Sequence, residues 1–156
     1  MKNIIVSITT AILFFSFMSY GKKAPDVYFE DLNGKKVYVE DFKGKPTVLV
    51  FWQLYCHSCK KELPEISKLA KEYEGKVRFY AVVIGTRDIL QIEEKKREWG
   101  FDLPVLIAGY KAKSAFGIFG TPITVVIDKN LDIKGKIIGS RRTFRLKEIL
   151  DKVVQE

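Results

Sequence analysis

Cysteine and histidine are scarce in this chain: its 156 residues include two cysteines and one histidine. A structural zinc site takes four Cys or His ligands, more than these residue types supply here. His57 lies between Cys56 and Cys59, where its ring and both sulfurs would not readily converge on one ion. A copper site would lack a third ligand. We therefore expect no metal and no other cofactor.

Long runs of one charge are also absent. Lys and Arg number 27 against 19 Asp and Glu, which gives a net charge of +8. Such basicity can indicate a nucleic-acid or anionic membrane partner, but no run reaches the roughly five like charges of an interaction tail. The short basic runs Lys60-Lys61 and Lys95-Lys96-Arg97 adjoin acids in the sequence, and the acids on either side of Arg141-Arg142 are Asp132 and Glu148. We interpret the excess as a solvated basic face and expect no nucleic-acid partner.

The chain lacks an apolar run long enough to span a bilayer. The longest, residues 4–18, is interrupted by Ser and Thr and is shorter than the roughly 18 apolar residues of a spanning helix. It follows Lys2 and precedes Ser19-Tyr20-Gly21, which is the layout of a secretory signal. We predict that residues 1–21 are a signal peptide cleaved after Gly21. An uncleaved N-terminal anchor is the alternative, which Lys22-Lys23 disfavours.

The rest of the chain, residues 22–156, has no repeat or linker and suits one domain. Export would place it in the periplasm or another extracytoplasmic compartment, free or anchored by its N-terminus. A disulfide can form and persist there, and two cysteines allow only one pairing.

The order of β-rich and helical patterns predicts an α/β fold. Asn33-Gly34 predicts a two-residue hairpin turn between strands at 27–29 and 36–39. A continuously apolar strand at 48–52, an amphipathic helix at 57–74 and a strand at 77–84 imply a right-handed parallel crossover. The remaining expected elements are a helix at 88–99 opened by an Asp88–Gln91 capping box, a strand at 104–107, a helical turn around 114–116, strands at 122–127 and 133–138, and a closing helix capped by Thr143.

The two cysteines lie at the junction of a strand and a helix, in the pattern Cys-x-x-Cys. Cys56 would then stand at the helix N-terminus, where free N–H groups and the positive end of the dipole stabilise a thiolate. Cys59 would lie one turn on, within disulfide distance. We predict a redox pair in which Cys56 attacks and Cys59 resolves the mixed disulfide. A purely structural staple is disfavoured, because so small a loop gains little entropy.

Two segments resemble one known family. "VLVFWQLYCHSCKKELP" resembles the active-site segment of thioredoxin-fold proteins, closest to the exported TlpA/ResA/DsbE-like thiol–disulfide oxidoreductases, and "FGTPITVVID" resembles their second motif. The segment before them is similar to the hairpin that these proteins carry ahead of the fold proper. The resemblance covers residues 24–155. It implies a thioredoxin fold, with a central mixed β-sheet flanked by helices and an N-terminal β-hairpin extension.

The resemblance also implies roles for the residues around the cysteines. Pro122 would be cis, and the Thr121 backbone would hold a substrate chain, although a proline that merely opens a strand is the alternative. Trp52 would shield the site, unless it simply packs in the core. Tyr55 stands where the family usually has Trp. A protonated His57 would favour thiolate and a more oxidising couple, or it would be an exposed bystander.

Two departures from the family concern buried acids. Val50 stands where thioredoxins carry a buried acid, and Thr86 where ResA-like members carry a glutamate. We therefore predict that no carboxylate of the chain manages the proton of Cys59. The same departures weaken an assignment to cytochrome c maturation.

The sequence thus predicts an exported, monomeric thiol–disulfide oxidoreductase. Its partners would be cysteine-containing extracytoplasmic proteins and a membrane thiol–disulfide electron donor. The resemblance favours a reductase, whereas His57 argues mildly for oxidation. One alternative is a thiol peroxidase, although Leu49 and Gln53 stand where such enzymes have Pro and Thr or Ser. The other is a binding module with an inert disulfide.

Overall fold

The computed structural model describes residues 21–156, so the predicted signal peptide lies outside the described residues except for Gly21. One mixed sheet of seven strands runs through the molecule in the order β2-β1-β5-β4-β3-β6-β7. Its strands are β1 (Tyr28–Asp31), β2 (Lys36–Tyr38), β3 (Thr47–Trp52), β4 (Arg78–Val83), β5 (Val105–Ile107), β6 (Ile123–Ile127) and β7 (Ile133–Ile138). The helices are η1 (Val39–Phe42), α1 (His57–Glu72), α2 (Ile89–Trp99), α3 (Tyr110–Ala115) and α4 (Thr143–Val153).

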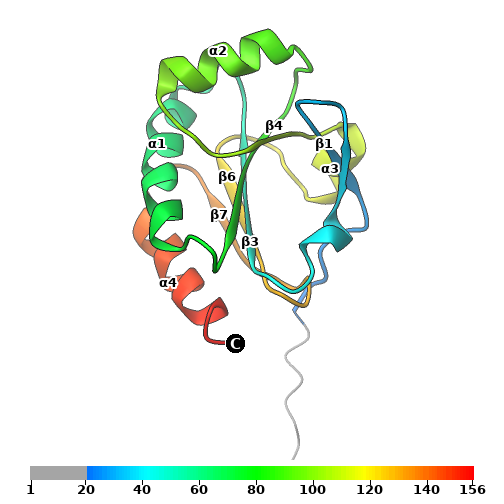
Figure 1. Ribbon diagram of the computed structural model, residues 1–156, viewed down its shortest axis with the longest axis vertical. Coiled ribbons are helices and arrows are strands. Elements are labelled where there is room, and N and C mark those ends of the chain that lie inside the picture. The colour runs from blue at the N-terminus through cyan, green and yellow to red at the C-terminus, as the bar shows by residue number, and fades with distance from the viewer. Residues whose placement is uncertain (1–20) are drawn as a thin grey trace, which may run out of the picture.

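Strand β3 is the central strand, and every one of its side chains is buried. It pairs parallel with β4 and antiparallel with β6. Because side chains alternate along a strand, Val48, Val50 and Trp52 join the core under α1 and α4. Leu49 and Phe51 join a second core on the other face. The sheet is therefore a middle layer covered on both faces, with α1 and α4 on one side and α3 on the other (Figure 1).

Helix α1 carries the side chains that face the first core. Leu63, Ile66 and Leu69 recur at helical spacing and are buried, and Pro64 lies inside the helix. Together with β3 and β4, α1 forms the parallel crossover, and the carboxyl ends of β3, β4 and β5 meet at one edge of the sheet. This edge is where the chain passes from β3 into α1.

The hairpin turn is longer than predicted. The Asp31 N–H donates to the Lys35 carbonyl at 2.8 Å, which leaves three residues in the loop, and Gly34 takes a φ of +78°. The carboxylate of Asp31 explains the difference, because it accepts from the N–H groups of Asn33 and Lys35, both at 2.9 Å.

Two helix starts also differ from prediction. Thr143 is the first residue of α4 and not its cap; Arg142 occupies the cap position without a side-chain bond. The preceding Arg141 has a φ of +64° and a tertiary backbone contact, which set the start one residue earlier. Helix α3 spans Tyr110–Ala115, whereas only a helical turn around residues 114–116 was expected.

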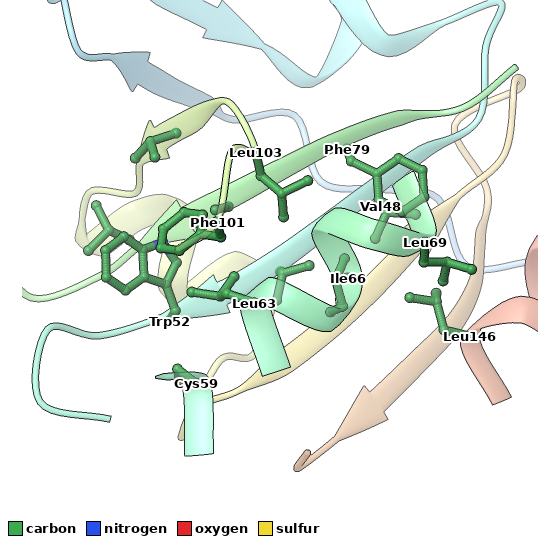
Figure 2. Close-up of a cluster of buried hydrophobic side chains, with 14 of the residues drawn as sticks. Val48, Trp52, Cys59, Leu63, Ile66, Leu69, Phe79, Phe101, Leu103 and Leu146 are labelled. Carbon is green, nitrogen blue, oxygen red and sulfur yellow. The ribbon is translucent and has the colours of Figure 1, made fainter. Parts of the chain in front are cut away.

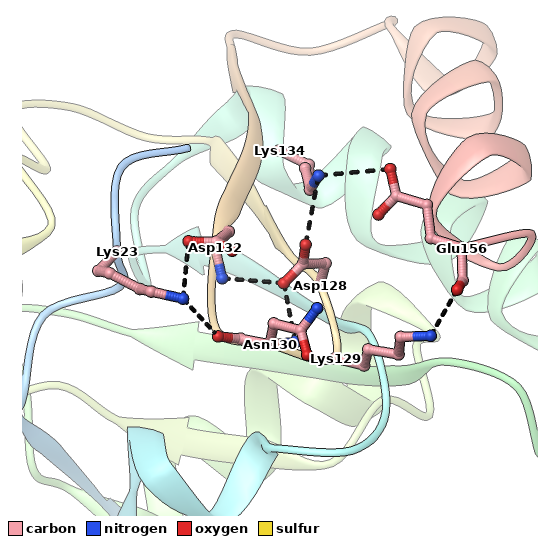
Figure 3. Close-up of polar contacts among 7 residues, drawn as sticks. All are labelled: Lys23, Asp128, Lys129, Asn130, Asp132, Lys134 and Glu156. Atoms are coloured by element: carbon pink, nitrogen blue, oxygen red, sulfur yellow. Dashed lines mark hydrogen bonds and ion pairs between the residues drawn. The ribbon is translucent and has the colours of Figure 1, made fainter. Parts of the chain in front are cut away.

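The edge of the sheet opposite the β3–α1 junction is closed by a polar network (Figure 3). The buried carboxylate of Asp128 accepts from the N–H groups of Asn130 and Asp132, both at 2.9 Å, and lies 3.3 Å from Lys134 Nζ. Lys23 pairs with Asp132 at 3.0 Å. The network therefore fixes the start of the described chain to the β6–β7 turn. No helix within residues 21–156 has the length and apolar character needed to cross a membrane.

Candidate active site

Cys56 and Cys59 form a disulfide at the start of α1. Cys56 occupies the N-cap position, and its Sγ accepts from the N–H of Cys59 at 3.2 Å. Cys56 is half-buried, whereas Cys59 is 0% exposed and belongs to the core. The pair is therefore asymmetric: only the first sulfur is open to a partner.

A shallow depression of about 390 Å³ opens over Cys56. Two of its lining residues, Tyr55 and His57, flank Cys56 in the sequence, and both are exposed, Tyr55 at 89%. The site thus combines an accessible sulfur, an exposed ring and an imidazole. The full lining is Gln53, Tyr55, Cys56, His57, Ser58 and Thr121.

The loop before β6 forms the other wall of this depression. The Thr121–Pro122 bond is cis, as the resemblance implied, and Pro122 is buried. The Pro122 carbonyl accepts from the Gly139 N–H at 2.9 Å, so the end of β7 lies beside this loop. The two family motifs, which are far apart in the sequence, therefore meet across the disulfide.

Trp52 is a core residue and does not cover the outside of the site. It is fully buried and packs edge-on against Trp99 and Phe101, with ring centroids 5.4 Å apart in both pairs. Cys59 and Leu63 belong to the same cluster, which Figure 2 shows. The Trp52 ring thus contributes to the apolar wall on the inner side of the disulfide. Its Nε1–H has no hydrogen-bond partner among the described residues.

A buried carboxylate follows Cys59 along α1, at neither of the two family positions named above. Glu62 follows Cys59 by three residues, on the same face of the helix, and is 5% exposed. Its Oε2 accepts from the Arg141 N–H at 2.7 Å. Burial raises the pKa of Glu62, and this hydrogen bond offsets part of that rise. The sequence signal for a buried Glu62 was its position, since it is an acid within the apolar stripe that Cys59, Leu63 and Ile66 define.

The two positions at which related proteins carry a buried acid hold Val50 and Thr86 here. Val50 is buried in β3, opposite Ala81 and Thr124 of the neighbouring strands. Thr86 lies in the turn before α2, where its hydroxyl accepts from the Asp88 N–H at 3.1 Å. The acid near the cysteines therefore comes from the helix itself and not from either family position.

The sequence left metal binding and peroxide reduction as alternatives to disulfide exchange. Among residues 21–156, no three His, Cys, Asp or Glu side chains gather in a way that could hold a metal ion. At the peroxidase positions, Leu49 is buried in the second core, and the Gln53 carboxamide accepts from the Thr121 hydroxyl at 3.2 Å.

Comparisons with known proteins agree with this geometry. Residues 20–136 match the AhpC/TSA family. The thiol–disulfide oxidoreductase ResA of Bacillus thuringiensis (strain Al Hakam) is 33% identical over 138 residues, which are 87% of this chain and 79% of the relative. The thioredoxin-like protein YneN of Bacillus subtilis (strain 168) is 29% identical, over 84% of this chain and 78% of the relative.

A solved structure confirms the fold. The thiol:disulfide interchange protein of the thioredoxin family from Chlorobium tepidum TLS superposes with a TM-score of 0.73, at 22% identity, over 86% of this chain and 97% of that one. The sequence relatives, the sheet order and the disulfide at the start of α1 lead to the same assignment. The chain belongs to the AhpC/TSA family and, within it, to the thioredoxin-fold thiol–disulfide oxidoreductases related to ResA.

Proposed function

We propose that the chain is an exported reductase that opens disulfides of extracytoplasmic proteins through Cys56 and Cys59. The observation that carries the proposal is the asymmetry of the pair. Cys56 Sγ stands half-buried at the N-terminus of α1, whereas Cys59 is fully buried behind it. A partner can reach Cys56 alone, which supports an attacking role for Cys56 and a resolving role for Cys59.

The reaction follows from these positions. In the reduced protein, the N–H groups and dipole at the start of α1 stabilise the Cys56 thiolate. This thiolate attacks one sulfur of the partner's disulfide; a new S–S bond forms, the old one breaks, and the partner's second sulfur leaves as a thiolate. Cys59 then loses its proton and attacks Cys56 Sγ, which releases the partner's first sulfur. Two electrons pass to the partner, whose two sulfurs take up two protons.

The neighbouring residues position the partner and handle the proton. The Thr121 backbone, beside cis-Pro122, would hold the partner's chain in an extended pairing next to Cys56. Tyr55 offers an exposed ring at the entrance. Glu62 would take the proton of Cys59, because it follows Cys59 on the same helix face and burial brings its pKa closer to that of a thiol.

The cellular setting completes the proposal. Residues 1–21 would direct export, either as a cleaved signal or as an anchor, and a membrane thiol–disulfide protein would return electrons to the pair. The folded domain would act as a monomer. His57, exposed beside Cys56, would make the couple less reducing than a neutral residue would.

One assay separates the candidate functions. The purified protein should catalyse the reduction of a protein disulfide by dithiothreitol and should not consume peroxide. Peroxide turnover would identify a thiol peroxidase, and inertness in both assays would identify a binding module. The reduction potential of the Cys56–Cys59 couple then sets the direction. A value well below the roughly −180 mV of protein disulfide isomerase supports a reductase, and a value above it supports an oxidase.

A further inference from the structure

The segment between β7 and α4 lies against the redox site through two backbone contacts. The Gly139 N–H donates to the Pro122 carbonyl at 2.9 Å, next to the cis bond. The Arg141 N–H donates to Glu62 at 2.7 Å. Glu62 is six residues along α1 from Cys56, a rise of about 9 Å at 1.5 Å per residue. The side chains that follow Arg141 therefore begin on the order of 10 Å from the reactive sulfur.

This segment is strongly basic. No acid occurs between Asp132 and Glu148, whereas six Lys and Arg residues do. Arg141, Arg142 and Arg145 are exposed, and none of the three is in an ion pair with a described residue. Glu62, which accepts from the Arg141 N–H, is buried. We call Arg141, Arg142 and Arg145 the basic rim.

Exposed aromatic side chains accompany the basic rim. Phe144 is 78% exposed and lies between Arg142 and Arg145. Tyr55 precedes Cys56 and is 89% exposed, and Phe119, which is 75% exposed, comes two residues before Thr121. Aromatic residues and arginine are the types enriched in protein–protein interfaces.

We propose that the basic rim binds an acidic segment of the partner protein, close in sequence to the partner's reactive cysteine; this rests on the proposed oxidoreductase function. Arginine suits this role because its planar guanidinium binds a carboxylate with two parallel hydrogen bonds. The three arginines break no ion pair within the described chain when they bind. An extended chain rises about 3.3 Å per residue, so an acid about three residues from the cysteine reaches the basic rim.

The test compares two peptide disulfides that differ only in the residue three positions from the reactive cysteine, Glu in one and Lys in the other. The full-length reduced protein should reduce the Glu peptide with a kcat/KM about tenfold higher at low ionic strength, since complementary charge raises the association rate. The advantage should shrink as salt is added. The double variant Arg142→Glu/Arg145→Glu should reverse the preference.

A matched control has the same change in net charge at the other edge of the sheet. Lys35 closes the β1–β2 hairpin and Lys76 lies two residues before β4; both are exposed. Lys35→Glu/Lys76→Glu should keep the preference for the Glu peptide. Equal rates for the two peptides with the unmodified protein would overturn the proposal, as would an equal loss of preference in the control.

Two further measurements distinguish this proposal from a failure of the oxidoreductase function and from membrane binding. All variants should reduce hydroxyethyl disulfide, which is small and uncharged, at the same rate; failure of the unmodified protein on this compound would refute the oxidoreductase function itself. Vesicles containing anionic phosphatidylserine test a lipid surface as the occupant. Vesicle binding that needs Arg142 and Arg145, without any preference between the peptides, would assign the basic rim to a membrane and overturn the peptide proposal.

Discussion

The hydroxyl of Thr121 donates a hydrogen bond to the side-chain carbonyl of Gln53 at 3.2 Å, and this bond joins the two loops that flank the disulfide. Gln53 also supplies the carbonyl that accepts from the Cys56 N–H at 3.2 Å. Its amide lies close to the β4–α2 turn, since a Cβ built on Gly85 would come within 3.5 Å of Gln53 Nε2. Gln53 is thus placed to hold the Thr121 loop at a fixed spacing from Cys56.

Removal of this bond should weaken substrate positioning and leave the redox couple unchanged. We expect Gln53→Ala to raise KM for a protein disulfide about three- to tenfold, because one hydrogen bond contributes roughly 0.5–1.5 kcal/mol. Thr121→Val should have a similar effect, and the double variant should be no worse than either single one. Steady-state kinetics and the reduction potential check this. Fully additive effects, or a shifted potential, would contradict it.

The buried Glu62 should give stability a characteristic pH dependence. Burial raises the pKa of Glu62 above its ordinary 4.5, so the folded protein holds this proton more tightly than the unfolded chain does. The resulting stabilisation is complete below pH 4.5 and is lost as pH rises through the folded-state pKa. Urea unfolding of the oxidised protein from pH 4 to 8 should therefore show Glu62→Gln gaining on the unmodified protein as pH rises.

Glu93→Gln is the matched control for this experiment, because Glu93 is exposed on α2 and is in no ion pair among the described residues. This variant should not reproduce the gain. Glu62→Gln should also slow the resolution of a mixed disulfide about 10²-fold or more, the usual contribution of a positioned base. A pH–rate profile of resolution that keeps its carboxylate ionisation in Glu62→Gln would rule out this role.

The two cysteine variants should behave unequally in trapping. Cys59→Ser leaves the accessible Cys56 without its resolving thiol, so mixed disulfides with partner proteins should accumulate. Cys56→Ser leaves only Cys59, which is fully buried, and should trap nothing. Non-reducing gel electrophoresis after exposure to a disulfide-containing protein measures both outcomes. Comparable trapping by the two variants would remove the assignment of roles.

Gly135 should resist substitution because β7 approaches α4 closely at this residue. A Cβ on Gly135 would lie 2.6 Å from Ile149 Cδ1, a distance that forces the side chain to move. We expect Gly135→Ala to cost about 1–3 kcal/mol of unfolding free energy, and the added substitution Ile149→Val to recover part of it. Gly109→Ala is the control, since nothing lies within 4 Å of its Cβ. Urea denaturation measures all three.

Local pattern was sufficient to predict the elements that carry the redox pair. The buried strand before Cys56, the amphipathic stripe of Leu63 and Ile66, and the disulfide are properties of contiguous sequence. The cis bond at Pro122 came from the family resemblance and not from composition.

The residues that were missed depend on contacts between distant segments. Glu62 and Arg141 are 79 positions apart, and only the return of the chain after β7 brings the Arg141 N–H to the carboxylate. That contact makes burial of the acid possible, and it also displaces the start of α4 from the cap expected at Thr143. The prediction that no acid serves Cys59 rested on Val50 and Thr86, the two positions at which related proteins carry one.

The described chain begins beside the β6–β7 turn. The Ala24 N–H donates to the Leu131 carbonyl within this turn, and the Ile133 N–H at the start of β7 donates to the Lys22 carbonyl. Ile127, at the end of β6, pairs with Thr47, the first residue of β3. Cys56 follows the last residue of the same strand, so residue 21 and the redox pair lie at opposite poles of the molecule (Figure 1). A domain tethered through its N-terminus would therefore turn the disulfide away from its point of attachment and outward to passing partners.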